Sequence, residues 1–123
     1  MSRILKGFFK LARLDRPIGI WLIFWPALAT LLATTQGQNF AKNLFIIIIG
    51  SIVVRSLGCV INDVFDRNID SKVARTKNRP IAAGQISVFE ALTFFVFLSL
   101  IVILLLIHTN FRTLLISLCF GLL

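Results

Sequence analysis

The chain has 123 residues, of which 58% are hydrophobic and 15% are charged. Soluble domains carry about 25% charged residues, so this composition excludes an ordinary soluble domain and a disordered tail. The 13 basic and 5 acidic residues give a formal net charge of +8. A nucleic-acid partner is nevertheless not expected, because long uncharged runs leave no solvated basic face of the kind that nucleic-acid binding needs.

Residues 1–16 are predicted to form an amphipathic arm that lies on the membrane surface. At helical spacing one side of this arm is apolar, and the other side carries basic residues that face lipid headgroups. The apolar side comprises Ile4, Leu5, Phe8, Phe9 and Ala12, and the basic side comprises Arg3, Lys6, Lys10 and Arg13. A flexible basic tail is the alternative that the sequence leaves open.

Three long runs without acidic or basic residues follow the arm, and Arg55 alone interrupts one of them. The runs cover residues 17–41, 43–62 and 91–111. A membrane-spanning helix needs about 20 predominantly apolar residues. We therefore predict three membrane-spanning helices, over residues 17–34, 44–62 and 88–107.

The third span and a fourth apolar segment complete the predicted layout. Ser87 and Glu90 have the spacing of a capping box, which predicts the start of the third span. The last uncharged run begins after Arg112 and is too short to cross a hydrocarbon core of about 30 Å. Residues 112–123 are therefore expected to be an incomplete fourth span. The predicted fold class is all-α integral membrane, with three transmembrane helices and a truncated fourth.

Basic residues predict the orientation of the spans. The arm holds five basic residues, and the segment 63–86 holds another five, whereas Lys42 and Arg112 are the only ones in the other connections. Cytoplasmic loops carry an excess of lysine and arginine. We therefore expect a multi-pass protein of the inner (plasma) membrane, with the N-terminus and residues 63–86 in the cytoplasm.

An acidic cluster at the end of the second span predicts a cation site. Asn62, Asp63, Asp66 and Asp70 lie along one side of a helix. Like charges at this spacing repel one another, and the helix dipole is already negative at a C-terminus. Carboxylate and amide oxygens suit Mg²⁺, which makes these four residues candidate metal ligands. The alternative is a solvated helix end whose acids pair with Arg67, Lys72 and Arg75.

Three arginines add a candidate phosphate site beside these acids. Arg55 lies within the second span on the same side, and an intramembrane charge is a functional hypothesis by default; the alternative is that it snorkels to the cytoplasmic edge. Arg75 and Arg79 have planar groups that grip phosphate oxygens in pairs. The combination predicts a site for a diphosphate whose apolar tail lies in the bilayer.

The motifs that carry these residues have a family resemblance. NDxxDxxxD at residues 62–70, preceded by Arg55 and followed by RTxxRP at residues 75–80, resembles the UbiA-type membrane prenyltransferases. DRPIG at residues 15–19 is similar to the 4-hydroxybenzoate polyprenyltransferase branch of that family, which acts in ubiquinone synthesis. The branches that make haem O or menaquinone share the first motif and stay open.

The resemblance implies a nine-helix fold and a Mg²⁺-dependent transfer of a polyprenyl group from its diphosphate to 4-hydroxybenzoate. It assigns metal and diphosphate handling to the positions of Asn62, Asp66 and Asp70, with the two aspartates as the catalytic pair. The positions of Arg55, Arg75 and Arg79 would assist with the diphosphate. Arg16 would hold the carboxylate of the acceptor. Asp63 belongs to the motif without a definite role.

The family also carries a second acidic motif that this sequence does not contain. The chain is therefore expected to be the N-terminal part of such an enzyme and to be inactive alone. The competing hypothesis is a non-catalytic membrane fragment that binds metal and prenyl diphosphate weakly or only occupies the membrane. A small cation carrier is disfavoured, because the acids lie at a helix end instead of deep within a span.

Overall fold

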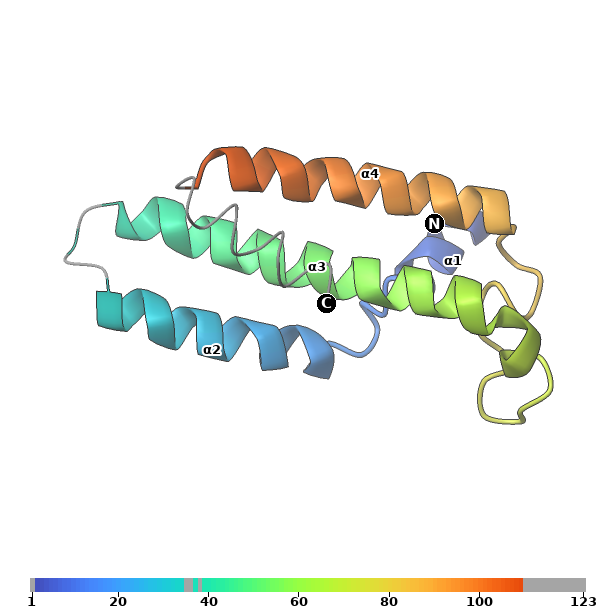
Figure 1. The fold of residues 1–123 in the computed structure, drawn as a ribbon. Coiled ribbons are helices and arrows are strands. Elements are labelled where there is room, and N and C mark those ends of the chain that lie inside the picture. Colours follow the sequence, from blue (N-terminus) through green and yellow to red (C-terminus); the bar gives the residue numbers. More distant parts are fainter. Residues whose placement is uncertain (1, 35–36, 38, 110–123) are drawn as a thin grey trace.

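The computed structural model describes residues 2–34, 37 and 39–109, and their secondary structure is entirely helical. The helices are α1 (Arg3–Leu11), α2 (Ile18–Thr34), α3 (Phe40–Asp70) and α4 (Val88–Ile107). Figure 1 shows α2, α3 and α4 lying side by side with α3 in the middle, and α1 beside the end of α3 at which the acidic residues lie. The all-α prediction is confirmed for the described part of the chain.

Helix α1 forms where the amphipathic arm was predicted, but its apolar residues are divided between two surroundings. Ser2 caps the helix by accepting a hydrogen bond from the backbone N–H of Leu5 at 3.3 Å. Leu11 is fully buried, and the ring of Phe8 packs on that of Phe94 with 4.8 Å between centroids. Leu5, by contrast, is exposed. The expectation of a single lipid-facing side was therefore incomplete, because part of the arm packs against the protein itself.

Two of the three long helices are long and apolar enough to cross a membrane, namely α3 and α4. Helix α2 is also apolar but has 17 residues, the lower end of the range of about 17–25 residues for a spanning helix. Many large apolar side chains of α4 are exposed, including Phe89 and Phe97, which suits a lipid environment. That α2, the first predicted span, also crosses the membrane remains a prediction, and the proposed fourth span at 112–123 lies outside the described residues.

Helix α3 continues well beyond the predicted span. It has 31 residues, which corresponds to about 46 Å at 1.5 Å per residue, whereas the hydrocarbon core is about 30 Å thick. The acidic cluster, which the sequence placed at the end of the second span, is thus on an unbroken part of the same helix. If its apolar part spans the core, the turns from Asn62 to Asp70 project beyond it.

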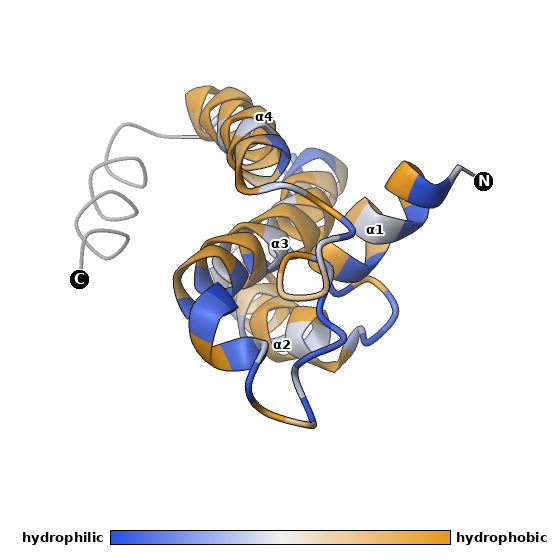
Figure 2. Cartoon of the chain, turned by 90° about the vertical axis from the view of Figure 1, so that its right-hand side faces the viewer, coloured by the Kyte–Doolittle hydropathy of each residue, from blue (hydrophilic) through white to orange (hydrophobic). Residues whose placement is uncertain are grey.

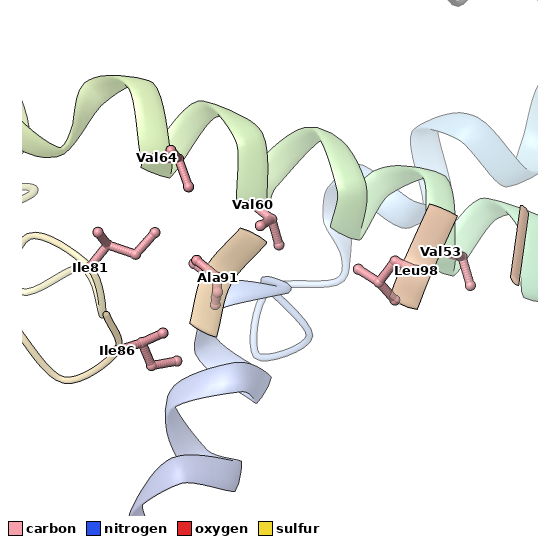
Figure 3. Close-up of a cluster of buried hydrophobic side chains, with 8 residues drawn as sticks. Val53, Val60, Val64, Ile81, Ile86, Ala91 and Leu98 are labelled. Atoms are coloured by element: carbon pink, nitrogen blue, oxygen red, sulfur yellow. The ribbon is translucent and has the colours of Figure 1, made fainter. Parts of the chain in front are cut away.

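A buried apolar cluster holds the connection between α3 and α4 against the helices. Val60 and Val64 of α3 face Ile81 and Ile86 of the connection and Ala91 of α4 (Figure 3). The predicted capping box is present, with Ser87 and Glu90 bonding each other's backbone N–H groups. These contacts fix the course of residues 71–86 and so place their arginines close to the end of α3.

Candidate functional site

An ion-pair network joins α1, α3 and the connection that follows α3. Asp63 Oδ1 accepts hydrogen bonds from Arg13 Nη2 and Arg79 Nη1, each at 3.1 Å. Arg79 Nη1 also donates to Asp70 Oδ2 at 2.7 Å. Polar residues gather at this end of the molecule, over α1, the last turns of α3 and the connection (Figure 2). The network therefore lies at the polar end of an otherwise apolar bundle.

Local structure explains how these side chains meet. Asp63 and Asp70 are seven residues apart, so both point from the same side of α3. The Thr76 hydroxyl donates to the backbone oxygen of Asp70 at 3.0 Å, which turns the chain back and brings Arg79 to the two carboxylates. Arg13 has a φ of 57°, a left-handed conformation that only a few per cent of non-glycine residues adopt.

Burial of the two carboxylates makes the ion-pair network costly in free energy. The side chain of Asp63 is 1% exposed and that of Asp70 is 7% exposed. A buried carboxylate is costly unless its charge is compensated, and here two guanidinium groups converge on one oxygen of Asp63. Its second oxygen, Oδ2, is buried and makes no hydrogen bond within the described residues. The charge of Asp63 is thus compensated by two arginines at one oxygen only.

The structure places the four predicted metal ligands in two different environments. Asn62 and Asp66 are exposed, and their side chains make no hydrogen bond or ion pair to other described residues. Asp63 and Asp70 are buried and paired with arginines. No group of three or more His, Cys, Asp or Glu side chains able to hold a metal occurs among the described residues. The metal assignment therefore stays a prediction.

The oxygens of Asn62, Asp66 and Asp70 nevertheless fit Mg²⁺ in kind. Asn62 and Asp66 are one helical turn apart, and Asp70 follows one turn later, with its Oδ1 not used in the ion pair to Arg79. Mg²⁺ is usually bound through one or two carboxylates together with substrate phosphates and water. These oxygens could therefore form the protein's share of a magnesium site completed by a diphosphate.

A basic pocket of about 430 Å³ lies beside the network. Five basic side chains and a single carboxylate, that of Asp15, contribute to its walls, so it favours an anion. The lining residues are Lys10, Arg13, Asp15, Arg16, Arg75, Thr76, Asn78, Arg79 and Pro80. The structure thus brings together three residues that the sequence assigned to anions, Arg16, Arg75 and Arg79.

Two further cations of this pocket were missed by sequence reasoning. Lys10 and Arg13 were assigned to lipid headgroups because both belong to the basic side of the arm. The excess of basic residues in the arm was a visible signal, but their contact with the connection after α3 depends on tertiary structure. Arg55 does not line the pocket. Its guanidinium lies against α2 at Gly19 and is not among the side chains that line the pocket with Arg75 and Arg79.

Comparison with known proteins identifies the family. The UbiA prenyltransferase family matches residues 23–123 of the chain. The chain belongs to this family. The recognition made from the motifs is therefore confirmed. UbiA members known as "4-hydroxybenzoate octaprenyltransferase" are similar to it. The protein of Shewanella amazonensis is 49% identical over 100 residues, that of Ectopseudomonas mendocina 47% over 110 residues, and that of Pseudomonas aeruginosa 54% over 94 residues.

The match covers most of this chain but a minor part of each UbiA relative. It includes 81%, 89% and 76% of the chain in these three comparisons, against 34%, 37% and 32% of the relatives. The chain therefore spans about a third of the length of the curated relatives that it matches. No solved structure matches it.

Proposed function

We propose that this chain takes part in the transfer of a polyprenyl group from its diphosphate to the aromatic ring of 4-hydroxybenzoate, a step of ubiquinone biosynthesis. The observation that carries the proposal is the basic pocket beside the acidic end of α3, at one end of a bundle of apolar helices. Such a site suits a substrate with an anionic head and an apolar tail. The names of the relatives support the choice of acceptor.

In this proposal the basic side chains bind the head of the donor and stabilise the leaving group. The carbon–oxygen bond between the prenyl group and the diphosphate breaks, and the diphosphate leaves with the electron pair. The ring carbon ortho to the hydroxyl group bonds to the prenyl carbon and loses its proton to solvent water. Arg75 and Arg79 line the pocket and are placed to stabilise negative charge that grows on the departing diphosphate. Arg16 holds the acceptor carboxylate from the same pocket.

We further propose that Asn62, Asp66 and Asp70 hold Mg²⁺, with Asp66 and Asp70 as the catalytic pair. When bound, the ion acts as a Lewis acid towards the diphosphate. Asp63 receives a different role in this proposal. Because Arg13 and Arg79 both bond to its Oδ1, it fixes two of the cations that line the pocket.

The proposal also includes the place of the protein in the cell. The apolar helices belong in a lipid bilayer, and we place them in the inner (plasma) membrane. The N-terminus and the basic pocket face the cytoplasm, following the excess of basic residues in the arm and in residues 63–86.

The test grafts this chain into one of the relatives. In the grafted enzyme, this chain replaces the matching segment of the Pseudomonas aeruginosa protein, and membranes of a strain without its own enzyme are assayed with radiolabelled 4-hydroxybenzoate. The matching segment of the Ectopseudomonas mendocina protein, grafted in the same way, is the control. We expect both to form prenylated product. A grafted enzyme that accumulates in the membrane without turnover, beside an active control, refutes the proposal.

Variants and other acceptors sharpen this test. Arg75→Ala is expected to raise the KM for the polyprenyl diphosphate, whereas Lys77→Ala is not, because Lys77 is exposed and does not line the pocket. Haem and naphthoate acceptors test the haem O and menaquinone branches, and preferential turnover of either would replace 4-hydroxybenzoate in the proposal.

The 123 residues expressed by themselves are expected to show no turnover. The second candidate function is a non-catalytic membrane protein that binds metal and prenyl diphosphate weakly. It is favoured by the bonds of Asp63 and Asp70 to arginines, which leave Asn62 and Asp66 as the exposed oxygen donors of the cluster. Product formation by membranes that contain this chain and no other prenyltransferase would contradict both the expectation and this second candidate.

A further inference from the structure

Helix α1 has three sides with different surroundings. Gly7 and Leu11 are buried against the rest of the protein. Leu5 and Phe9, one helical turn apart, form an apolar edge and are 57% and 43% exposed. The remaining side carries exposed basic residues, namely Arg3, Lys6 and Lys10. An exposed apolar edge beside a basic side is typical of a helix that lies in a membrane surface.

The direction of α1 agrees with such a position. Figure 2 shows the molecule from its polar end, with α2, α3 and α4 seen nearly along their axes, and α1 runs sideways away from them. If the long helices cross a bilayer, a helix that runs across their direction at the polar end lies along the membrane surface. Helix α1 is therefore placed at the level of the lipid headgroups.

A groove of about 500 Å³ lies along the basic side of α1. Its lining residues are Arg3, Lys6, Phe9, Lys10, Asp15 and Gln85. None of the three basic residues forms an ion pair with a described residue, whereas the one carboxylate, that of Asp15, lies 4.0 Å from Nε of Arg16. The groove therefore combines a net positive charge with an aromatic wall.

We propose that this groove binds the headgroup of an anionic phospholipid. The phosphate accepts hydrogen bonds from Arg3 and Lys6, and the acyl chains lie along the apolar edge formed by Leu5 and Phe9. A soluble anion would use the same basic residues but would gain nothing from the exposed apolar edge. The inference uses the placement of the apolar helices in a bilayer and does not depend on the proposed reaction.

Arg3 and Lys6 are the residues to replace, because they line the groove and not the basic pocket. Lys10 lines both spaces and is left unchanged. Since neither Arg3 nor Lys6 forms an ion pair with a described residue, their replacement removes no such contact within the fold. Lys77 provides the matched control, because it is exposed in the connection after α3 and lines neither space.

The measurement is the binding of phosphatidylglycerol with a fluorescent acyl chain to the purified 123-residue chain in neutral detergent, followed by fluorescence anisotropy. Phosphatidylcholine with the same chains is the reference lipid and should bind more weakly. Each lysine or arginine near an anionic membrane surface strengthens the attraction by about fivefold. Lys6→Gln should therefore weaken phosphatidylglycerol binding about fivefold, and adding Arg3→Gln should weaken it by a similar factor again. Lys77→Gln should stay within about twofold of the parent.

Phe9→Ala tests the apolar part of the site and should weaken the binding of both lipids. Inorganic phosphate should not displace the bound phosphatidylglycerol. Equal affinities for the two lipids would overturn the proposal, and so would equal effects of Lys6→Gln and Lys77→Gln, which would show a general attraction between charges instead of a site. Displacement of the lipid by inorganic phosphate, together with an unchanged affinity of Phe9→Ala, would identify a soluble anion as the occupant.

Discussion

Replacing Asp63 by asparagine removes the charge that Arg13 and Arg79 share and keeps the shape of the side chain. Oδ1 of Asp63 lies 3.1 Å from a nitrogen of each arginine, and the amide of asparagine would put either a weaker acceptor or an N–H donor there. Both guanidinium groups would then lack their common counter-charge. Because the three residues come from α1, α3 and the following connection, the change should loosen all three segments together.

The expected loss of stability follows from the exposure of the partners. Breaking a fully buried ion pair costs about 3–5 kcal/mol, whereas an exposed pair contributes about 0–1 kcal/mol. Arg13 and Arg79 are 29% and 25% exposed, so water can solvate part of the charge that is left, and Arg79 keeps its bond to Asp70. We expect a loss of about 2 kcal/mol in the free energy of unfolding, roughly a 30-fold change in the ratio of folded to unfolded protein.

The assay is a denaturant titration of the grafted enzyme in detergent, without divalent ions. Asp66→Asn is the control, because Asp66 lies one turn away on the same helix but is exposed; its stability should change by less than about 0.5 kcal/mol. If Asp63→Asn is as stable as this control and binds Mg²⁺ more weakly than the parent, Asp63 is a metal ligand. The account of it as the partner of Arg13 and Arg79 would then be wrong.

Three further outcomes are expected. Asp66→Asn should abolish most turnover of the grafted enzyme at unchanged stability. Asp70→Asn should lower both turnover and stability, because Asp70 accepts a 2.7 Å hydrogen bond from Arg79. Equal stabilities of the two variants would contradict this contrast. Ser87→Ala removes the hydroxyl that caps α4 and should lower the free energy of unfolding by about 1 kcal/mol, measured by denaturant titration. Cysteines introduced at positions 38 and 77 test the orientation by labelling of intact cells, and labelling of position 77 alone from outside would reverse it.

Local patterns were sufficient to predict the bounds of α2 and α4. The predicted span 88–107 coincides with α4, and 17–34 differs from α2 by one residue, because hydrophobic runs and a capping box are properties of neighbouring residues. These features need no knowledge of what packs against a helix. The predicted span 44–62 lies inside α3, but α3 begins four residues earlier and ends eight residues later, at Asp70.

Which residues of the acidic cluster are buried and which are exposed was not predictable in the same way. Helical periodicity places Asp63 and Asp66 on one broad face, but it does not indicate which edge of that face meets α1 and the connection. Arg13 contacts Asp63 across 50 residues of sequence, and no periodic pattern encodes such a pair. Burial of Asp63 and exposure of Asp66 are therefore consequences of tertiary packing alone.

The bond between Arg13 and Asp63 also sets an order of events during synthesis. Ribosomes add about 5–20 residues per second, so Arg13 is made roughly 3–13 seconds before Arg79, the last member of the network. By then α2 and α3 have been synthesised completely, and Asp63 on α3 is already available to Arg13. The arm can therefore join α3 before the connection supplies Arg79 and before α4 is made. Damage to Arg79 should accordingly affect a later step of assembly than damage to Arg13.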